Sequence, residues 1–405
     1  MTGPTSSLSL PSASANQSLF PTTLASVGWQ AQARLLVTAD SVSPIVAARV
    51  YAMLGVAQYG AVVDADARVD RLGILKEQGV GNGDGGRRRS EARRGAVAAA
   101  SARILSALFP RAAVVAAIEQ RFRDEQAASP QGLESYFAIG VPVGRAFGDV
   151  MIAWKANDRF TDAWTGTLPT GAGFWTRNPA PVGGTLPALA GPQFGAMKPY
   201  FLRGGDQFHS ADPPAFRSAA FFTDLAEVSA FSATRTPAQL ESAIAWNLNV
   251  GSVTALGRWD EFASGFIAEN HFDELAAAHV FALTNAAAMD AVIACWESKF
   301  SFSYIRPYQV DQVTYPITTP LGKPNHPSYP SGHSCVSSAA AAVIEEFFPE
   351  HAGWLEQQVI DAGNSRIYGG LHYRFDIVAG QSLGRAVAGE ALKYDRELGL
   401  LDAVR

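Results

Sequence analysis

The sequence predicts an all-α protein made of two packed helical bundles. Apolar residues recur at helical spacing in long Ala-rich stretches, and no stretch alternates apolar and polar residues as a half-buried β-strand would. The chain has 405 residues, of which 48% are hydrophobic and 17% are charged. A chain of this size and composition can bury a large core.

The expected helices follow from these patterns in order along the chain. The first begins at Ser43, where Pro44 suits a first helical turn, and two more cover 97–109 and 112–122. Residues 79–95 combine a Gly-rich turn with an arginine cluster, which predicts a solvated loop. Further helices are expected to begin near Ser218, Pro237, Phe272, Ser334 and Arg374.

Changes in composition divide the chain into four parts. Residues 1–25 are polar and are predicted to be disordered. Residues 26–165 form an expected N-terminal helical half, and residues 218–405 form a C-terminal helical half. The segment 166–217 between them is dense in Pro, Gly and aromatic residues, as functional loops of this length often are.

Charge and cysteine content exclude several classes of protein. The 32 basic and 37 acidic residues give a net charge of −5, which argues against a nucleic-acid binder. With only two cysteines, Cys295 and Cys335, a disulfide scaffold and a Cys-based structural zinc site are both excluded.

The sequence also predicts that the protein is not embedded in a membrane. Its most apolar stretch, 275–296, contains His279 and Asp290, so it is expected to be a buried helix. The first 15 residues have no basic residue and no long apolar run, unlike a secretory leader. We expect a soluble protein, cytoplasmic unless a leader has been removed, with a homo-oligomer as an open option.

Three short segments hold the residues with the most chemical information: 299–307 (KFSFSYIRP), 330–333 (PSGH) and 365–376 (SRIYGGLHYRFD). Lys299, Arg306 and Arg366 supply three positive charges, enough to balance a trianionic tetrahedral oxyanion, and arginine binds such oxygens with paired N–H groups. Ser331 and Gly332 stand at the start of an expected helix, where anions are favoured.

Two histidines accompany these cations. His333 and His372 can each act as a base, acid, nucleophile or ligand near neutral pH. A buried group of three cations is costly unless an anion balances it, so a phosphate-like group is expected to bind there.

The pattern resembles the one shared by type 2 phosphatidic acid phosphatases, bacterial acid phosphatases and vanadium-dependent haloperoxidases. It reads K-x6-R-P, P-S-G-H and S-R-x5-H-x3-D, and this sequence matches all eleven fixed positions, with gaps of 22 and 31 residues. A looser likeness to bacterial haloperoxidase-type proteins extends to Pro199, to 208–216 (FHSADPPAF) and to 288–300. The resemblance implies an all-α fold with the anion site in the C-terminal bundle.

The resemblance also implies a role for each matching residue. Lys299, Arg306, Ser331, Gly332 and Arg366 correspond to the residues that bind the oxyanion. His372 corresponds to the residue that coordinates vanadium in the haloperoxidases and attacks phosphorus in the phosphatases. His333 corresponds to the general acid or base, and Asp376 to the residue that orients His372.

Vanadate and phosphate have similar shapes, so other features must choose between the two chemistries. Trp296, three residues before Lys299, and His326, seven residues before His333, resemble the haloperoxidases, and His326 resembles the bromide-oxidising ones. We therefore expect vanadate as cofactor and hydrogen peroxide, halide and a small organic acceptor as partners, with Lys299 polarising the peroxide. A soluble phosphomonoesterase and a non-catalytic oxyanion-binding protein are the alternatives.

Overall fold

The computed structural model describes residues 24–73 and 82–404, and side chains are described from residue 85 onward in the second range. The segment predicted to be disordered, 1–25, lies outside the described residues except for its last two. The first helix already begins at Ala25.

The expected all-α class is confirmed: the described residues contain no β-strand, and Phe174 and Tyr304 form an isolated bridge. The helices, including four short 3₁₀ helices (η), are α1 (Ala25–Ala39), α2 (Pro44–Arg71), α3 (Asn82–Leu108), α4 (Ala112–Ala127), α5 (Glu134–Ala156), η1 (Pro192–Ala196), α6 (Ala219–Thr234), α7 (Pro237–Ala245), α8 (Thr254–Glu269), α9 (Glu274–Phe302), η2 (Pro307–Gln309), α10 (Gly332–Phe347), η3 (Pro349–His351), α11 (Ala352–Tyr368), α12 (Arg374–Leu398) and η4 (Leu400–Ala403).

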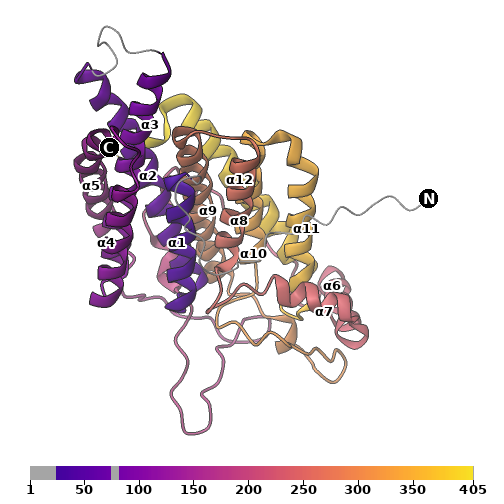
Figure 1. Ribbon diagram of the computed structural model, residues 1–405. Coiled ribbons are helices and arrows are strands. Elements are labelled where there is room, and N and C mark those ends of the chain that lie inside the picture. The colour runs from indigo at the N-terminus through magenta and orange to yellow at the C-terminus, as the bar shows by residue number, and fades with distance from the viewer. Residues whose placement is uncertain (1–23, 74–81, 405) are drawn as a thin grey trace.

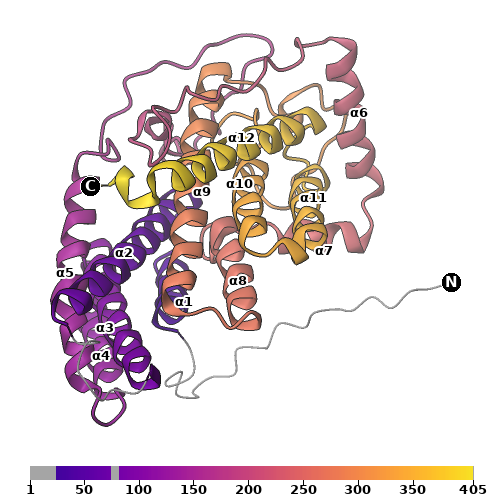
Figure 2. The same ribbon diagram turned by 90° about the horizontal axis from the view of Figure 1, so that it is seen from above.

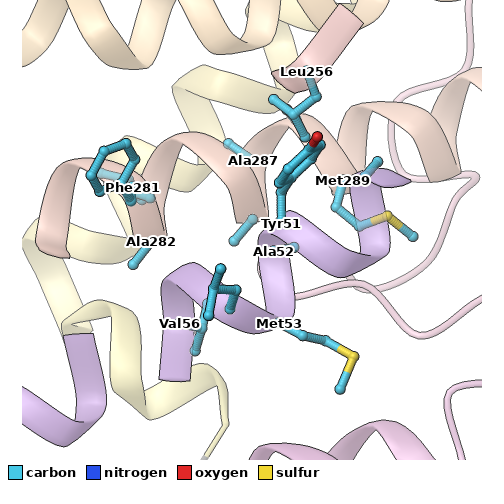
Figure 3. Packing of buried hydrophobic residues seen from close by; sticks show 14 of the residues in the cluster. Tyr51, Ala52, Met53, Val56, Leu256, Phe281, Ala282, Ala287 and Met289 are labelled. Carbon is cyan, nitrogen blue, oxygen red and sulfur yellow. The ribbon is translucent and has the colours of Figure 1, made fainter. Parts of the chain in front are cut away.

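Helices α2 and α9 lie at the centre of the molecule. Figures 1 and 2 show α3, α4 and α5 on one side and α6, α7 and α11 on the opposite side. The larger of two hydrophobic clusters in the described residues runs from α1 to η4 and includes both α2 and α9. Figure 3 shows part of this core, with Tyr51 and Val56 of α2 beside Phe281 and Ala287 of α9.

Small residues let these central helices approach closely. A Cβ atom added at Gly55 of α2 would lie 2.9 Å from the carbonyl oxygen of Phe281 in α9. Real Cβ atoms do not approach backbone oxygens so closely, so glycine is needed at this crossing. The same tight packing holds α9, which ends at the candidate site, in a fixed place.

The expected solvated loop over 79–95 is wrong for its described C-terminal part, because α3 begins at Asn82. The arginines of this stretch form ion pairs with other helices instead of facing solvent alone. Arg93 binds Asp66 of α2 at 2.8 Å and Asp273, the N-cap of α9, at 2.7 Å. These partners, distant in sequence, explain why a local pattern of Gly and Arg did not predict the helix.

Within residues 24–73 and 82–404, three helices have the length and composition to cross a membrane: α2, α5 and α9. The apolar windows of α2 and α9 are 83% and 94% buried inside the protein, whereas that of α5 is 33% buried. In α9, which covers the stretch 275–296, the other helices therefore surround nearly all of the apolar surface.

The segment between α5 and α6 is irregular apart from η1. It is tied to the chain that follows α9: the amide of Trp175 donates to the carbonyl of Ser303 (2.7 Å), and the amide of Ala190 donates to the carbonyl of Asn325 (3.1 Å). In Figure 1 both segments lie at the lower end of the helices. The irregular segment thus covers the end of the fold where α9 stops.

Candidate oxyanion site

The three motif segments meet where several helices begin or end. Lys299 lies in the last turn of α9, which stops at Ser303 in a left-handed conformation (φ 47°). Gly332 opens α10, and Arg366 lies in the last turn of α11. Because helix ends carry unpaired backbone groups and accept sharp changes of direction, they can bring distant charged residues together.

Two of the three predicted cations are fully buried and bound by backbone carbonyl groups. The Lys299 ammonium donates to the carbonyls of Ser328 (2.8 Å), Pro327 (3.1 Å) and Pro330. Arg306 donates through Nη1 to the carbonyl of Leu371 (2.8 Å), and through Nη2 to that of Pro327 (3.2 Å). Carbonyl oxygens carry only partial charge, so they satisfy the donors without neutralising the cations.

Arg366, the third cation, is held from the other side of the site. Its Nε donates to the Ser365 hydroxyl (3.0 Å), and its Nη2 donates to the carbonyl of Ala243 in α7 (3.0 Å). None of the three cations forms an ion pair with a carboxylate of the described residues. Burial lowers the pKa of Lys299 to about 8, and burial and then the Arg306 charge lower the pKa of Arg366 to about 9.

His372 is oriented by Asp376, as the spacing of four residues predicts. Its Nδ1 lies 2.8 Å from Oδ2 of Asp376, and its Nε2 lies 3.0 Å from Nη1 of Arg306. Since Arg306 can only donate, Nε2 must carry the lone pair and Nδ1 the proton. Ser328 donates to the same carboxylate oxygen at 2.6 Å. The sequence did not point to this contact, although Ser328 lies only two residues before the 330–333 segment (PSGH).

Burial shifts the pKa of both ionisable groups of this pair toward the neutral form. Burial, followed by the charges of Arg306 and Lys299, lowers the pKa of His372 well below its usual value. Burial raises the pKa of Asp376 to about 6, against the opposing effect of the Ser328 hydrogen bond. At neutral pH the imidazole is therefore uncharged, and its Nε2 lone pair accepts a hydrogen bond from Arg306 that a bound ligand would replace.

His333 has a buried polar atom without a partner. Its Nε2 is shielded from solvent and makes no hydrogen bond in the described part of the chain. Burial and the Arg366 charge lower the His333 pKa well below its usual value, while hydrogen bonds to the backbone of Asn247 and Trp246 act in the opposite direction. An unpaired buried nitrogen is costly, so this site is suited to an incoming hydrogen-bonding group.

The backbone amide of Ser331 is already paired within the fold, so it is not free to bind an anion. Its amide donates to the backbone carbonyl of Asp376 (2.9 Å), and its hydroxyl caps α10 by accepting from the amide of Ser334 (3.4 Å). The hydroxyl proton is still free to donate to an anion. Gly332 packs against Trp296: a Cβ there would lie 3.3 Å from the indole.

A cavity of about 620 Å³ lies beside these residues. Its lining contains Gly332, His333, Arg366 and His372, together with Trp296 and His326. The rings of Trp296 and His326 are 5.3 Å apart, and the indole N–H donates to the carbonyl of Ala190 at 2.8 Å. His326 Nδ1 also lies 3.2 Å from Nη2 of Arg306.

The comparisons with known proteins agree with this geometry. Residues 275–399 match the PAP2 superfamily, and this segment contains all three motif segments. Over this segment the sequence is therefore similar to PAP2 superfamily domains. This match agrees with the resemblance that the three motif segments indicate.

Two curated proteins match parts of this chain. A non-specific acid phosphatase of Salmonella typhi is 39% identical over 57 residues, and an undecaprenyl-diphosphatase of Sulfolobus acidocaldarius is 32% identical over 90 residues. These matches cover 14% and 22% of this chain, and 23% and 41% of the two relatives. The chain thus spans less than half the length of each.

Solved structures match almost the whole chain in fold. A bacterial vanadium-dependent iodoperoxidase superposes with a TM-score of 0.73 and 22% identity, covering 93% of this chain and 98% of the other. A bacterial vanadium-dependent chloroperoxidase superposes with a TM-score of 0.67 and 15% identity, covering 89% and 94%. At these identities the likeness establishes the fold.

The donors fit a highly charged oxyanion such as vanadate better than they fit a metal cation. Arg366 and His333, whose Nε2 is unpaired, line the cavity, and the fully buried Lys299 and Arg306 add two further positive charges beside the histidines. Among the residues that the structure describes, no group of three or more His, Cys, Asp or Glu side chains is placed to hold a metal ion. One uncharged imidazole whose Nε2 can exchange its Arg306 partner for a ligand atom, supported by cationic donors, suits a tetrahedral oxyanion with its own oxygen ligands.

Proposed function

We propose that this protein is a vanadium-dependent haloperoxidase that oxidises bromide or iodide with hydrogen peroxide to hypohalous acid. The observation that carries the proposal is the unpartnered Nε2 of His333 beside the cation cluster. Because the pKa of His333 is lowered, its imidazole is neutral and can take a proton, which peroxide activation requires.

The residues that would hold vanadate are Lys299, Arg306, Ser331, Gly332, Arg366 and His372. When bound, vanadate supplies a Lewis acid that activates hydrogen peroxide without a change in oxidation state. His372 would contact it through Nε2, since its Nδ1 is engaged by Asp376. Asp376 acts as the residue that fixes the tautomer and the ring orientation of His372.

The remaining residues accept the proton of hydrogen peroxide and supply positive charge at the site. His333 accepts the proton that leaves hydrogen peroxide. Lys299 holds a fixed positive charge next to the reacting oxygen atoms, which favours attack by a halide ion. His326, between Trp296 and Arg306, can form a hydrogen bond at the site and so limit its oxidising strength, which supports bromide or iodide over chloride.

A soluble phosphomonoesterase is the second candidate, and the match to the Salmonella typhi acid phosphatase favours it. His372 would attack phosphorus, a phosphorus–nitrogen bond would form as the ester bond breaks, and His333 would protonate the leaving alcohol. This last step requires a protonated His333, a state that burial and the Arg366 charge oppose in the anion-free site. A non-catalytic oxyanion-binding protein is the third candidate.

One assay separates the three candidates. The purified protein, freed of bound anions, is tested for hydrolysis of p-nitrophenyl phosphate and, with peroxide and bromide, for bromination of a phenol dye, before and after orthovanadate is added. We expect bromination that depends on vanadate. Phosphate ester hydrolysis that vanadate abolishes, with a phosphohistidine trapped at His372, would overturn the proposal, and so would the absence of both activities.

Two variants test the roles of the histidines. His372→Ala should lose vanadate binding, whereas His333→Ala should keep part of the binding and lose turnover. Calorimetric titration with orthovanadate measures the first property, and the dye assay measures the second. Bromination at the wild-type rate by both variants would show that the assignment is wrong.

A further inference from the structure

The cavity extends well beyond the oxyanion site, and its far wall is apolar. This apolar wall consists of Ile45, Val46, Phe160, Phe194, Leu256 and Val292. These residues come from α2, α8, α9, η1 and the segment after α5. A volume of about 620 Å³ lies within the range of about 300–1,000 Å³ that holds a drug-sized ligand. Hydrogen peroxide and a halide ion need only a small part of it.

We propose that the apolar wall binds the hydrocarbon part of an organic acceptor, which is then halogenated inside the cavity. The proposal rests on the haloperoxidase function. Hypohalous acid transfers its halogen to a carbon atom of the acceptor, the carbon–hydrogen bond breaks, and the released proton leaves with the hydroxide of the acid as water. Burial of the hydrocarbon part supplies the binding free energy.

The apolar wall is continuous with the oxyanion site along one helix. Val292 and Trp296 are four residues apart in α9, so they lie one above the other on the same face, and both line the cavity. The Trp296 indole in turn lies against Gly332 and His326. A hydrocarbon group in contact with Val292 therefore lies about one helical turn from the ring that borders the site.

The wall is held in place by tight packing. Gly191 has a left-handed conformation (φ 59°), and a Cβ there would lie 2.2 Å from Cδ1 of Ile45 and 2.7 Å from the ring of Phe194. The ring of Phe194 also packs edge-to-face on Phe160, with centroids 5.7 Å apart. A preformed wall lowers the entropic cost of binding, because few side chains must become ordered.

The cavity is also open to an incoming molecule. Asn249, Val250, Gly322 and Lys323 belong to its lining and are exposed to solvent. The same cavity is thus lined by exposed residues, by the apolar wall and by the histidines of the site. An organic acceptor can enter at the exposed residues without passing through the packed core.

Binding of two matched probes tests the proposal without vanadate and without turnover. Methylphosphonate and n-octylphosphonate share the anionic group and differ in the tail, so their affinities for the anion-free protein are compared by calorimetry. We expect n-octylphosphonate to bind roughly 100-fold more tightly, the gain from burying about four methylene groups. Equal affinities in the wild type would overturn the proposal.

Substitutions in the apolar wall locate the tail. Val292→Phe fills the cavity next to Trp296, and Val46→Asn places a polar group on the half-buried face of α2. Each should lower the affinity ratio of the two probes to less than about one fifth of the wild-type ratio. Thermal melting verifies folding, and either folded variant suffices. An unchanged ratio in a folded variant would show that the tail binds elsewhere and would overturn the proposal.

The vanadate-loaded enzyme provides a readout that separates this proposal from the haloperoxidase function. The ratio of ortho- to para-brominated product from a 3-alkylphenol is compared with the ratio produced by free hypobromous acid. A different ratio, altered again in Val292→Phe, supports halogenation inside the cavity. Bromination with the ratio of the free reagent would overturn the acceptor site but leave the haloperoxidase function intact, whereas no bromination at all would overturn the function.

Discussion

Replacing Asp376 with asparagine tests how the carboxylate sets up His372. Three donors converge on its Oδ2: Nδ1 of His372 at 2.8 Å, the Ser328 hydroxyl at 2.6 Å and the amide of Tyr373 at 3.2 Å. An asparagine oxygen can accept the same hydrogen bonds, so Asp376→Asn removes the negative charge and preserves the shape.

The expected loss follows from the difference between charged and neutral hydrogen bonds. A bond to a charged group contributes about 1.5–3 kcal/mol and a neutral one about 0.5–1.5 kcal/mol, so the bond to His372 weakens by about 1–1.5 kcal/mol. The imidazole also becomes a weaker ligand, as is typical when the partner of a metal-bound histidine is lost. We expect the dissociation constant of vanadate to rise by about 10–100-fold.

The assay is calorimetric titration of the anion-free protein with orthovanadate at pH 7. Asp224→Asn is the matched control, because Asp224 accepts the amide of Phe375 at 2.7 Å at the start of the same helix, α12, without contacting His372. The control should bind vanadate as the wild type does. Wild-type affinity in Asp376→Asn would refute the argument that the carboxylate tunes His372.

Three further predictions concern pH, halide choice and stability. Phosphate should bind the anion-free protein more weakly as the pH rises above 8, because Lys299 (pKa about 8) and then Arg366 (about 9) lose the protons that the anion favours; a flat calorimetric profile from pH 7 to 10 would contradict this. His326→Phe should raise the rate of chloride oxidation relative to bromide, and an unchanged ratio would remove the basis for the role of His326. Glu274→Ala should reduce the free energy of unfolding by about 2–5 kcal/mol, since the buried Glu274 carboxylate accepts the amides of Ala25 and Ser26 at 2.8 Å; an unchanged urea midpoint would contradict this.

The sequence alone predicted that the three motif segments lie together, because the chemistry of these segments depends on residue type and spacing. The four-residue step from His372 to Asp376 places His372 just before α12 and Asp376 in its first turn, where the carboxylate also accepts the amide of Tyr373. Ser331 was expected at the start of a helix, and it caps α10. Local rules suffice here, since each helix end is set within a few residues.

The sequence was less informative where glycine and proline lie inside helices. No helix was predicted over 134–156, a stretch that contains Gly140, Pro142 and Gly144, and residues of these types usually end helices. In α5 the two glycines instead face α3: a Cβ at Gly140 would lie 2.0 Å from the carbonyl oxygen of Ala92, and one at Gly144 would lie 2.0 Å from that of Ala96. The helix is stabilised by close packing against a partner that the local sequence does not reveal.

Contacts from distant segments also decide what each cation can do. All three N–H groups of Lys299 have carbonyl partners in the loop 327–330, so in this arrangement Lys299 contributes charge to the site without a free donor. An anion can take a hydrogen bond from Lys299 only by replacing one of these carbonyls, whereas the His333 nitrogen has no partner to give up. The motif contains both residues without distinguishing them. In the fold, His333 can bind the anion without losing a hydrogen bond, whereas Lys299 holds the loop 327–330 in place.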